Sequence, residues 1–367
     1  MIKSVSGLIE KELFGKKDLL RVDFNVPVAD GKIIESYRII SVKETVDYLA
    51  SRGAVVAILS HITAIKSFKP LVGQIKETLG RDLKFIPGSN IGPDITANLK
   101  LAESGKIFFL ENVRQNPAEE ANDENFAKEL AANFDIYVND AFAVCHREHA
   151  SLSAITKFLP SYGGLLLMKE IEHLTKAIEM PREGKTLILG GAKVNTKFPV
   201  IKNFLNKAEN ILIGGAVANV FLKAKGIAIG ESLTDDSFLE DAKNIINSKA
   251  GIIIPEDYIE SECMILDIGQ KTTAEFSEII GKSKVIIWNG PLGRIETPEL
   301  AHGSESVAKA ITNSKAFSIA GGGDTIVLIR KMNLMDKFSY ISTGGGAMLN
   351  FLAGKSLPGL MALNHNG

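Results

Sequence analysis

The amino-acid sequence predicts an α/β protein made of two doubly wound parallel-sheet domains joined by a helix. Its length of 367 residues exceeds one compact core and favours two domains. Short apolar runs alternate with helical patterns through both halves, which is typical of parallel sheets covered by helices. With 45% hydrophobic and 23% charged residues, the composition is that of a globular protein and excludes disorder, collagen and coiled coil.

In the first half, apolar runs predict strands at 19–24, 54–59, 106–110 and 135–138. Apolar residues between them recur at helical spacing, clearly at Ile39, Val42, Val46, Leu49 and Ala50, and more weakly at Phe126, Leu130 and Phe134. This alternation predicts the first parallel sheet.

The second half repeats the scheme without a detectable sequence repeat. Its predicted strands are 186–189, 210–213, 264–267, 285–288, 317–320 and 338–342, with helices such as 240–248 and 305–312. We expect a second parallel sheet here.

Between the halves, residues 165–181 form one uninterrupted amphipathic stretch closed by Pro181. We interpret it as the connecting helix between a domain at 1–164 and a domain at 182–351, because a stiff helix transmits a hinge angle that a Gly/Ser linker cannot. The alternative is one more crossover helix.

Charge and cysteine content exclude several classes of protein. A net charge of −1 argues against a nucleic-acid or membrane-surface partner, since neither meets an attractive field. No apolar run reaches the ~18 residues of a membrane span, and the N-terminus has no signal-type apolar region. Two cysteines cannot form a disulfide framework or a zinc site. We therefore expect a cytoplasmic protein.

Ligands in open α/β sheets bind beyond the carboxyl ends of the strands. In the first half, charged and amide side chains come after those ends or open the next helix: Asp23, Asn25, Arg38, His61, Arg114 and, a few residues further on, Arg147. A guanidinium matches carboxylate or phosphate oxygens with two parallel bonds. The pattern predicts a pocket for a small, multiply anionic molecule, with isolated surface salt bridges as the alternative.

In the second half, glycines come after the strands where helices begin, which lets a phosphate approach bare backbone N–H groups. The run Gly321–Thr325 gives the clearest pattern: Gly322 and Gly323 cradle an oligophosphate, Asp324 offers a carboxylate to Mg²⁺, and Thr325 caps the helix or donates to phosphate. Lys193 and Lys197 lie one helical turn apart. The other strand-end residues are Gly190, Gly191, Gly214, Gly215, Asn289 and Pro291. A nucleotide domain is favoured over ordinary glycine turns.

Other patterns are absent or weak. The P-loop motif and the G-x-G-x-x-G motif with its acidic partner are both missing, which weighs against a P-loop protein and a dinucleotide dehydrogenase. Cys145 beside His146 is expected to be a packed thiol rather than a nucleophile. Trp288 is expected to fill a core, and His149 to make a structural hydrogen bond.

With these motifs in place, the sequence resembles the phosphoglycerate kinase family from about Leu20 to Leu363. The stretches that carry the likeness are RVDFNVPVADGKI (21–33), LENVRQNPAEE (110–120), YVNDAFAVCHREHAS (137–151), LGGAKVNTK (189–197), IGGAVANVFLKAKG (213–226), WNGPLGRIE (288–296), AGGGDT (320–325) and STGGGA (342–347). Together and in this order they are highly specific.

The resemblance implies a hinge-bending monomer that transfers phosphoryl between 1,3-bisphosphoglycerate and ADP, with Mg²⁺. It implies that the six strand-end residues of the first half hold the phosphoglycerate, that Lys193 and Lys197 contact nucleotide phosphates and the transferred group, and that Glu296 takes the ribose hydroxyls. Arg38 and Lys197 are the expected catalytic residues. Residues 352–367 are expected to return to the first domain.

The chemistry agrees with such a reaction. The first half offers few obvious general-base carboxylates, and a carboxylate acceptor needs none because it is already ionised at neutral pH. Making or cleaving an acyl phosphate then requires mainly positioning and charge neutralisation. The alternatives are a catalytically weakened binding relative and, more remotely, a dehydrogenase.

The chain departs from the family pattern at several positions. Ala64 stands where the family usually supplies an arginine to the non-transferred phosphate, with Lys66 and Lys69 nearby. One lost charge-assisted bond weakens binding by about 1.5–3 kcal/mol. Smaller departures are Ala216, which replaces the third glycine of a run near the adenine site that the resemblance implies, and Gln115, Asn116 and Ala118 after Arg114.

Overall fold

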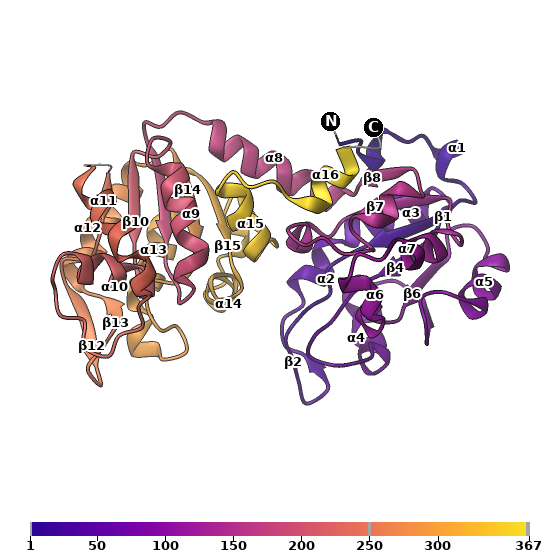
Figure 1. Cartoon of the computed structure of the whole chain (residues 1–367), viewed down its shortest axis with the longest axis horizontal. Helices are drawn as coiled ribbons and strands as arrows, with labels where there is room; N and C mark the ends of the chain where they lie inside the picture. The colour runs from indigo at the N-terminus through magenta and orange to yellow at the C-terminus, as the bar shows by residue number, and fades with distance from the viewer. Residues whose placement is uncertain (1, 249–250, 365–367) are drawn as a thin grey trace. The chain divides into compact units, whose positions relative to one another are not determined.

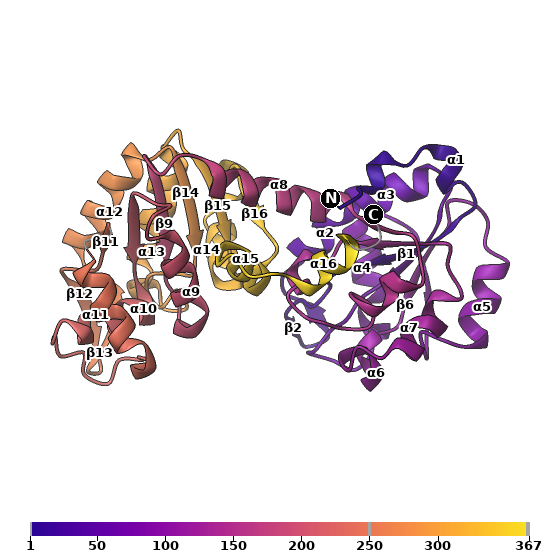
Figure 2. The same cartoon turned by 45° about the horizontal axis from the view of Figure 1, so that its top comes forward.

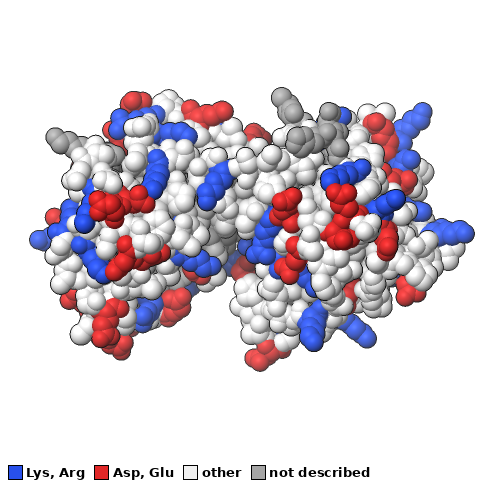
Figure 3. Space-filling model, viewed as in Figure 1, with Lys and Arg blue, Asp and Glu red and all other residues white. Residues whose placement is uncertain are grey.

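The computed structural model describes residues 2–248 and 251–364. The chain divides into two compact units: unit 1 runs to Ile171 and includes the segment from Ser356 onward, and unit 2 is Glu172–Lys355. Each unit contains a six-stranded sheet with helices packed against it (Figure 1). On the face drawn in Figure 3, basic and acidic side chains are interspersed over both units, in keeping with the small net charge. Among the described residues, no helix has the length and apolar character needed to cross a bilayer.

The sheet of unit 1 is parallel throughout and has the order β5-β6-β4-β1-β7-β8. Its strands are β1 Lys17–Arg21, β4 Val55–Leu59, β5 Lys84–Ile86, β6 Ile107–Leu110, β7 Ile136–Asn139 and β8 Ser161–Gly163. All residues of β4 and β6 are buried, as expected for strands covered on both faces. The chain leaves β1 in one direction and returns to its other side at β7, which makes the β1/β7 crevice a switch point.

The remaining elements of unit 1 are α1 Glu10–Leu13, a hairpin of β2 Val28–Ala29 and β3 Lys32–Ile33, α2 Tyr37–Ser41, α3 Lys43–Ser51, α4 Val72–Leu79, α5 Pro93–Lys100, α6 Pro117–Glu120, α7 Glu124–Ala131 and α16 Pro358–Asn364. Ile39, Val42, Val46 and Leu49 are buried, as their helical spacing predicts. The late helix α16 packs in this unit, where the Gly359 N–H donates to the carbonyl of Cys145 at 2.9 Å.

Unit 2 also has a parallel sheet, with the order β11-β10-β9-β14-β15-β16 and a switch point between β9 and β14. The strands are β9 Lys185–Leu189, β10 Asn210–Ile213, β11 Ile252–Ile253, β14 Val285–Asn289, β15 Phe317–Gly321 and β16 Tyr340–Ser342. The helices are α9 Val194–Phe204, α10 Gly215–Ala224, α11 Leu239–Asn247, α12 Gln270–Lys282, α13 His302–Asn313, α14 Gly323–Lys331 and α15 Gly345–Leu352. Helices α9 and α15 lie side by side (Figure 2). Two doubly wound sheets confirm the predicted fold class.

Some strand predictions were wrong in detail. Residues 264–267 are not in the parallel sheet: β13 Met264–Ile268 pairs antiparallel with β12 Tyr258–Ser261 in a separate two-stranded sheet. The first strand ends at Arg21 rather than at residue 24, because the chain turns there into the candidate site. The short strands β5, β8 and β11 were not predicted, since two or three residues leave no apolar run to read.

The connecting helix α8 extends over Leu165–Glu179, and the boundary between the units falls inside it. At its first turn, the Leu167 N–H donates to Asp140 Oδ1 at 2.9 Å. At its last turn, Lys185 Nζ donates to the Ile178 carbonyl at 2.6 Å. Each end is therefore tied to the unit that contains it. The predicted domain limits at 164/165 and 351/352, and the roles of the two domains, stay predictions.

Asp18 provides a test of how burial sets stability. Its side chain in β1 is fully buried, and no described residue donates a hydrogen bond to either carboxylate oxygen. Burial, and secondarily the charge of Asp135, raises its pKa to about 8. Between pH 4 and pH 8 the unfolded chain has lost this proton and the folded chain keeps it, so stability falls as pH rises.

We expect Asp18→Asn to remove this pH dependence. Relative to the parent protein, the variant should gain free energy of unfolding from pH 5 to pH 8 by at most about 1.4 kcal/mol per pH unit. Urea unfolding at four pH values measures this difference. A difference that stays constant with pH would show that Asp18 is ionised in the folded protein.

Candidate active site

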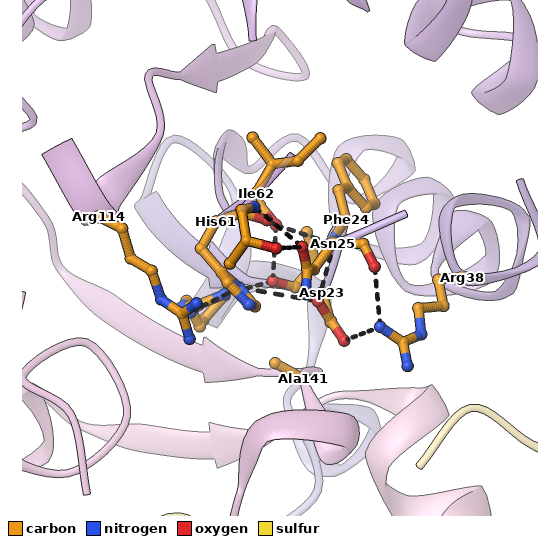
Figure 4. Close-up of polar contacts among 12 residues, drawn as sticks. Asp23, Phe24, Asn25, Arg38, His61, Ile62, Arg114 and Ala141 are labelled. Atoms are coloured by element: carbon orange, nitrogen blue, oxygen red, sulfur yellow. Dashed lines mark hydrogen bonds and ion pairs between the residues drawn. The ribbon is translucent and has the colours of Figure 1, made fainter. Parts of the chain in front are cut away.

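In unit 1, the candidate site lies at the edge of the sheet where the carboxyl ends of neighbouring strands meet. The register pairs Arg21 with Leu59 on one side and with Asn139 on the other, so the segments after β1, β4 and β7 emerge together. Figure 4 shows Asp23, Asn25, His61 and Arg114 around this edge, with Arg38 reaching it from α2. The parallel register thus brings together residues separated by up to about ninety positions.

Asp23 holds Arg38 in place. Arg38 Nη1 forms an ion pair with Asp23 Oδ2 at 2.9 Å and donates to the Asn25 carbonyl at 2.9 Å. The Asn25 N–H donates to Asp23 Oδ1 at 3.0 Å, and its side-chain oxygen accepts from the N–H and hydroxyl of Thr63 at 3.0 and 2.9 Å. Asp23 and Asn25 therefore fix the loop and the arginine. Both contacts use Nη1, which leaves the rest of the guanidinium fork available to an anion.

His61 is a neutral hydrogen-bond donor. Burial, and then the charges of Arg21, Arg114, Arg147 and Arg38, hold its pKa well below its usual range. Its Nδ1 lies 3.4 Å from Arg21 Nη2 and 3.7 Å from Asp23 Oδ1. Only the arginine is within hydrogen-bond distance and it can only donate, which assigns the proton of the neutral ring to Nε2. No described residue accepts from that buried Nε2.

Arg114 adds a second set of unused donors. Its side chain is 9% exposed, and its Nε lies 3.3 Å from Glu120 Oε1 in an ion pair. Neither Nε nor Nη2 makes a hydrogen bond within the described chain. Burial, and then the charge of Arg147, lower the pKa of Arg114. Concentrated cationic donors without protein acceptors are the signature of an anion site.

Arg21 was not among the predicted site residues, although it holds the site together. It is fully buried, its Nε donates to Ser151 Oγ at 2.8 Å, and its Nη2 lies 3.8 Å from Glu119 Oε1. Glu119 also accepts from the Ser151 hydroxyl at 2.6 Å. Arg21 was not predicted to have this role because it is inside the β1 run, where a basic residue is ordinarily expected on the surface.

A cavity of about 870 Å³ opens beside Arg114 and contains the position of the missing arginine. Its walls are Ile62, Thr63, Ala64, Ile65, Lys66, Asn112, Arg114, Gln115 and Glu120. The loop of residues 62–66 is held at the Lys66 carbonyl, which accepts hydrogen bonds from Gln115 Nε2 at 2.8 Å and from Asn112 Nδ2 at 3.1 Å. Gln115, a departure from the family pattern, therefore fixes the loop that carries Ala64.

Three minor expectations have clear outcomes. Cys145 is buried, and burial raises the pKa of its thiol to about 12, so it is a packed thiol. Trp288 is fully buried and donates to the Gly290 carbonyl at 2.9 Å. His149 was expected to make a structural hydrogen bond. Its buried Nδ1 makes none with the described chain and lies 3.9 Å from Glu119 Oε1, so the prediction was wrong for this nitrogen.

In unit 2, the glycine turns come after five strands that end together. Leu189 pairs with Ile213 and with Asn289, Asn289 pairs with Gly321, and Gly321 pairs with Ser342. Two glycines are required by close approach: a Cβ on Gly190 would lie 2.1 Å from the Pro291 carbonyl oxygen, and one on Gly290 (φ +93°) would lie 2.3 Å from that of Gly190. Gly322, at φ +103°, precedes α14.

Helices α9, α14 and α15 begin around one cavity of about 250 Å³, and none of the three has a side-chain cap. Uncapped first turns present free N–H groups and positive helix ends to an anion. The cavity is lined by Gly191, Ala192, Lys193, Thr196, Lys197, Asn289, Gly290, Pro291, Gly322, Gly323, Asp324, Thr325, Gly345, Gly346 and Leu349. A Cβ on Gly323 would meet no protein atom within 4 Å, so that space is open.

Lys197 is the buried cation of this cavity. It is 5% exposed, and its ammonium donates to Asn289 Oδ1. Burial lowers its pKa to about 8, with Asp324 opposing the shift and Lys193 adding to it.

Thr325 does not cap α14. Its Oγ1 accepts a hydrogen bond from the Gly290 N–H at 2.9 Å, which ties the loop at Gly290 to the helix.

A second cavity, of about 260 Å³, shares Gly191, Ala192, Pro291 and Asp324 with the first. It also contains Gly215, Glu296 and Ala216, the departure already noted in the glycine run. Its remaining lining residues were not predicted: Asn219, Leu233, Met264, Ile265, Leu266, Gly293 and Arg294. Most of these come from α10 and the β12–β13 hairpin, whose tertiary position no local pattern reveals. Gly190 and Gly214 line neither cavity, and a Cβ on Gly214 would lie 2.5 Å from Leu292.

Asp324 suits a magnesium ion that travels with a phosphate chain. No group of three or more His, Cys, Asp or Glu side chains able to hold a metal occurs in the described part of the chain. Mg²⁺ commonly binds through one or two carboxylates, several waters and substrate phosphates. A single carboxylate at the junction of the two cavities, beside an uncapped helix end, fits that requirement.

Cationic donors without protein partners in one α/β unit, and three uncapped helix ends around a buried lysine in the other, are the features expected of a phosphotransferase. The model of the family described as phosphoglycerate kinase matches residues 8–355. The chain is similar to phosphoglycerate kinases of Dictyoglomus turgidum (41% identity, 98% of each chain covered) and Finegoldia magna (40%, with 94% and 95% covered). A solved phosphoglycerate kinase from Pyrococcus horikoshii OT3 matches with a TM-score of 0.90 and 33% identity over 100% of this chain and 99% of that one.

The chain belongs to the phosphoglycerate kinase family. This confirms the resemblance drawn from the strand-end motifs and makes the protein a phosphotransferase. Individual residue roles stay predictions.

Proposed function

We propose that this chain transfers phosphoryl between 1,3-bisphosphoglycerate and ADP by direct in-line displacement, with unit 1 holding the phosphoglycerate and unit 2 the nucleotide. The observation that carries this assignment is Lys197, a buried ammonium at the meeting point of three uncapped helix ends. Charge of this kind stabilises a phosphoryl group in transit. Family membership supports the same reaction.

The chemistry of unit 1 supports a carboxylate as the acceptor. Asp23 is engaged by Arg38 and by the Asn25 N–H, so it orients groups and is not a free base. An ionised carboxylate attacks without losing a proton, and a site of cationic donors then aligns it and neutralises its charge. Arg38, His61, Arg114 and Arg147 are the proposed donors.

In unit 2, Lys193, Lys197 and the N-termini of α9 and α14 are the proposed phosphate ligands, and Glu296 the ribose acceptor. Asp324 would hold Mg²⁺, which neutralises oligophosphate charge when it is bound. Closure about α8 is the proposed route by which the ligands meet. We further propose a cytoplasmic monomer.

A coupled assay tests the function: purified protein, ADP, Mg²⁺ and 1,3-bisphosphoglycerate should yield ATP at the rate typical of kinases, 1–100 per second to order of magnitude. Because Lys197, Arg38, Glu296 and Asp324 are all present, the binding-only alternative has no support. Tight binding of both substrates without turnover would reverse that conclusion.

Ala64→Arg should tighten binding of 3-phosphoglycerate by about tenfold, because one charge-assisted hydrogen bond is worth about 1.5–3 kcal/mol. The cavity beside Arg114 has room for the longer side chain. In the parent protein we propose that Lys66 partly compensates, since it lines this cavity and Lys69 does not. Calorimetric titration measures the change.

Ala64→Met is the matched control, with added length and no donor, and it should bind no more tightly than the parent protein. Equal affinities of the arginine variant and the parent would show that no phosphate reaches this cavity.

The lowered pKa of Lys197 predicts a pH dependence of ADP binding. Below pH 8 the side chain is an ammonium, and above pH 8 the unliganded chain loses that charge. The affinity for ADP should therefore fall severalfold between pH 7 and pH 9.5. Lys197→Met, which has no proton to lose, should show a flat profile over this range in the same titration. Parallel profiles would rule out Lys197 as the titrating group.

A further inference from the structure

Glu119 is a carboxylate enclosed within unit 1. It belongs to the short helix α6, which follows Arg114 in the chain, and its side chain is fully buried. Its Oε2 accepts a hydrogen bond from the Ser151 N–H at 2.8 Å, and its Oε1 accepts one from the Ser151 hydroxyl at 2.6 Å. The Ala150 N–H also donates to the Glu119 carbonyl at 2.8 Å. Burying a carboxylate is unfavourable unless hydrogen bonds replace its water, and here the segment at Ser151 supplies them.

These contacts join the two segments that carry the arginines of the anion site. Arg114 precedes α6, and Glu120 of the same helix forms the ion pair with it. Arg147 lies only four residues before Ser151. The bonds between Glu119 and Ser151 therefore limit how far the two guanidinium groups can move apart. Donors held in place bind an anion more tightly than mobile ones, because less conformational freedom is lost on binding.

The same carboxylate is connected to a third donor through Arg21. The Ser151 hydroxyl, which donates to Glu119, accepts a hydrogen bond from Arg21 Nε at 2.8 Å. Arg21 Nη2 lies 3.8 Å from Glu119 Oε1 and 3.4 Å from His61 Nδ1. The buried network thus extends from α6 to the ring whose Nε2 faces no protein acceptor among the described residues.

We propose that Glu119 is a positioning residue of the anion site, whose carboxylate fixes the spacing of Arg114 and Arg147 for the anionic substrate. The inference rests on the proposed function, in which these arginines bind phosphoglycerate.

Position and charge predict opposite effects for this residue. Burial lowers the pKa of Arg114, and the charge of Glu119 acts against that shift, so the carboxylate is felt at the site. A negative charge among cationic donors repels an anionic ligand, and removing the charge alone would tighten anion binding. Releasing the arginines from a fixed spacing would weaken it. A role in stability alone would lower the unfolding temperature and leave the affinity of the folded protein unchanged.

Two substitutions of Glu119 separate these possibilities. Glu119→Gln keeps the length of the side chain, removes its charge and replaces one acceptor oxygen by a donor. Glu119→Asp keeps the charge but is one methylene shorter, so it reaches less far toward Ser151. We expect both full-length variants to bind 3-phosphoglycerate about tenfold more weakly than the parent protein, and to bind ADP with the parent affinity. Calorimetric titration measures both ligands, and thermal unfolding of each variant shows that it is folded.

Asp18→Asn is the matched control, because it makes the same carboxyl-to-amide change at another fully buried position of unit 1. It should bind 3-phosphoglycerate as the parent does. Ser151→Ala decides the question if the Glu119 variants do not fold. It removes the hydroxyl shared by Glu119 and Arg21, keeps the buried charge, and should weaken 3-phosphoglycerate binding severalfold.

Tighter binding of 3-phosphoglycerate by folded Glu119→Gln would overturn the inference and make charge the dominant effect of this residue. Parent affinity in either folded Glu119 variant, or in Ser151→Ala where those do not fold, would also overturn it and leave the proposed function intact. An equal weakening of ADP binding would do the same. A parent protein that binds ADP but not 3-phosphoglycerate would refute the proposed function of unit 1 together with this inference.

Discussion

Lys197→Ala should lower kcat by about a thousandfold while changing the KM of either substrate by only a few fold. The ammonium is buried, is aimed by Asn289 Oδ1 and lies where three helix ends converge. Removing one preorganised charge of this kind typically lowers kcat by about 10²–10³. The substitution lowers kcat rather than raising KM because the ammonium interacts more strongly with the phosphoryl group in the transition state than with the bound nucleotide. Steady-state kinetics with both substrates varied measures the split.

Lys202→Ala is the matched control, because Lys202 is on the same helix, half exposed and paired with Asp241 at 2.8 Å. It should retain parent kinetics. Lys193→Ala should show an intermediate result, a higher KM for nucleotide with a smaller loss of kcat, since Lys193 lines the cavity from an exposed position. Unchanged turnover in Lys197→Ala would refute its catalytic role.

Arg38→Ala should lower kcat by about a hundredfold or more, and Arg38→Lys should not restore it. Asp23 and the Asn25 carbonyl hold Nη1, so the planar fork is oriented before substrate arrives. A lysine has the charge but not the two parallel donors. Single-turnover kinetics reports the chemical step apart from product release.

Loss of Arg38 also leaves Asp23 without its ion pair, so thermal unfolding of each variant must accompany the kinetics. Arg52→Ala is the matched control in unit 1: Arg52 stacks over the Tyr48 ring at 3.6 Å and does not line the cavity beside Arg114. It should keep full activity. A variant of Arg38 whose KM rises while kcat is unchanged would make that residue a ligand of the ground state only.

The success of the sequence in predicting the fold has a simple basis. Runs such as Val55–Leu59 and Val285–Asn289 are buried on both faces, and a strand of that kind must be apolar along its whole length. The 264–267 run has the same composition, yet it is only half buried and pairs in a hairpin. Composition records a preference for strand, and the choice of partner depends on segments distant in the sequence.

The candidate sites were predicted for a similar reason. Parallel strands end at one edge, so the residues just beyond each strand, among them Asp23, His61 and Arg114, can be grouped without knowledge of the coordinates. The same rule does not separate a glycine that faces a ligand from one that faces the protein. Gly323 opens onto the cavity, while Gly190 and Gly214 pack against the 290–292 segment.

Apolar periodicity and strand-end motifs are local properties of the chain, so the α/β class, the two sheets, the connecting helix and the family could be predicted without coordinates. Which polar groups remain without partners depends on how the chain folds in three dimensions. The free Nε2 of His61, the unused Nη2 of Arg114 and the unpaired Oδ1 of Asn219 are the atoms left over when their side chains contact Arg21, Glu120 and Leu233. Burial and hydrogen bonding are properties of surroundings, and those surroundings are assembled from residues far apart in the sequence.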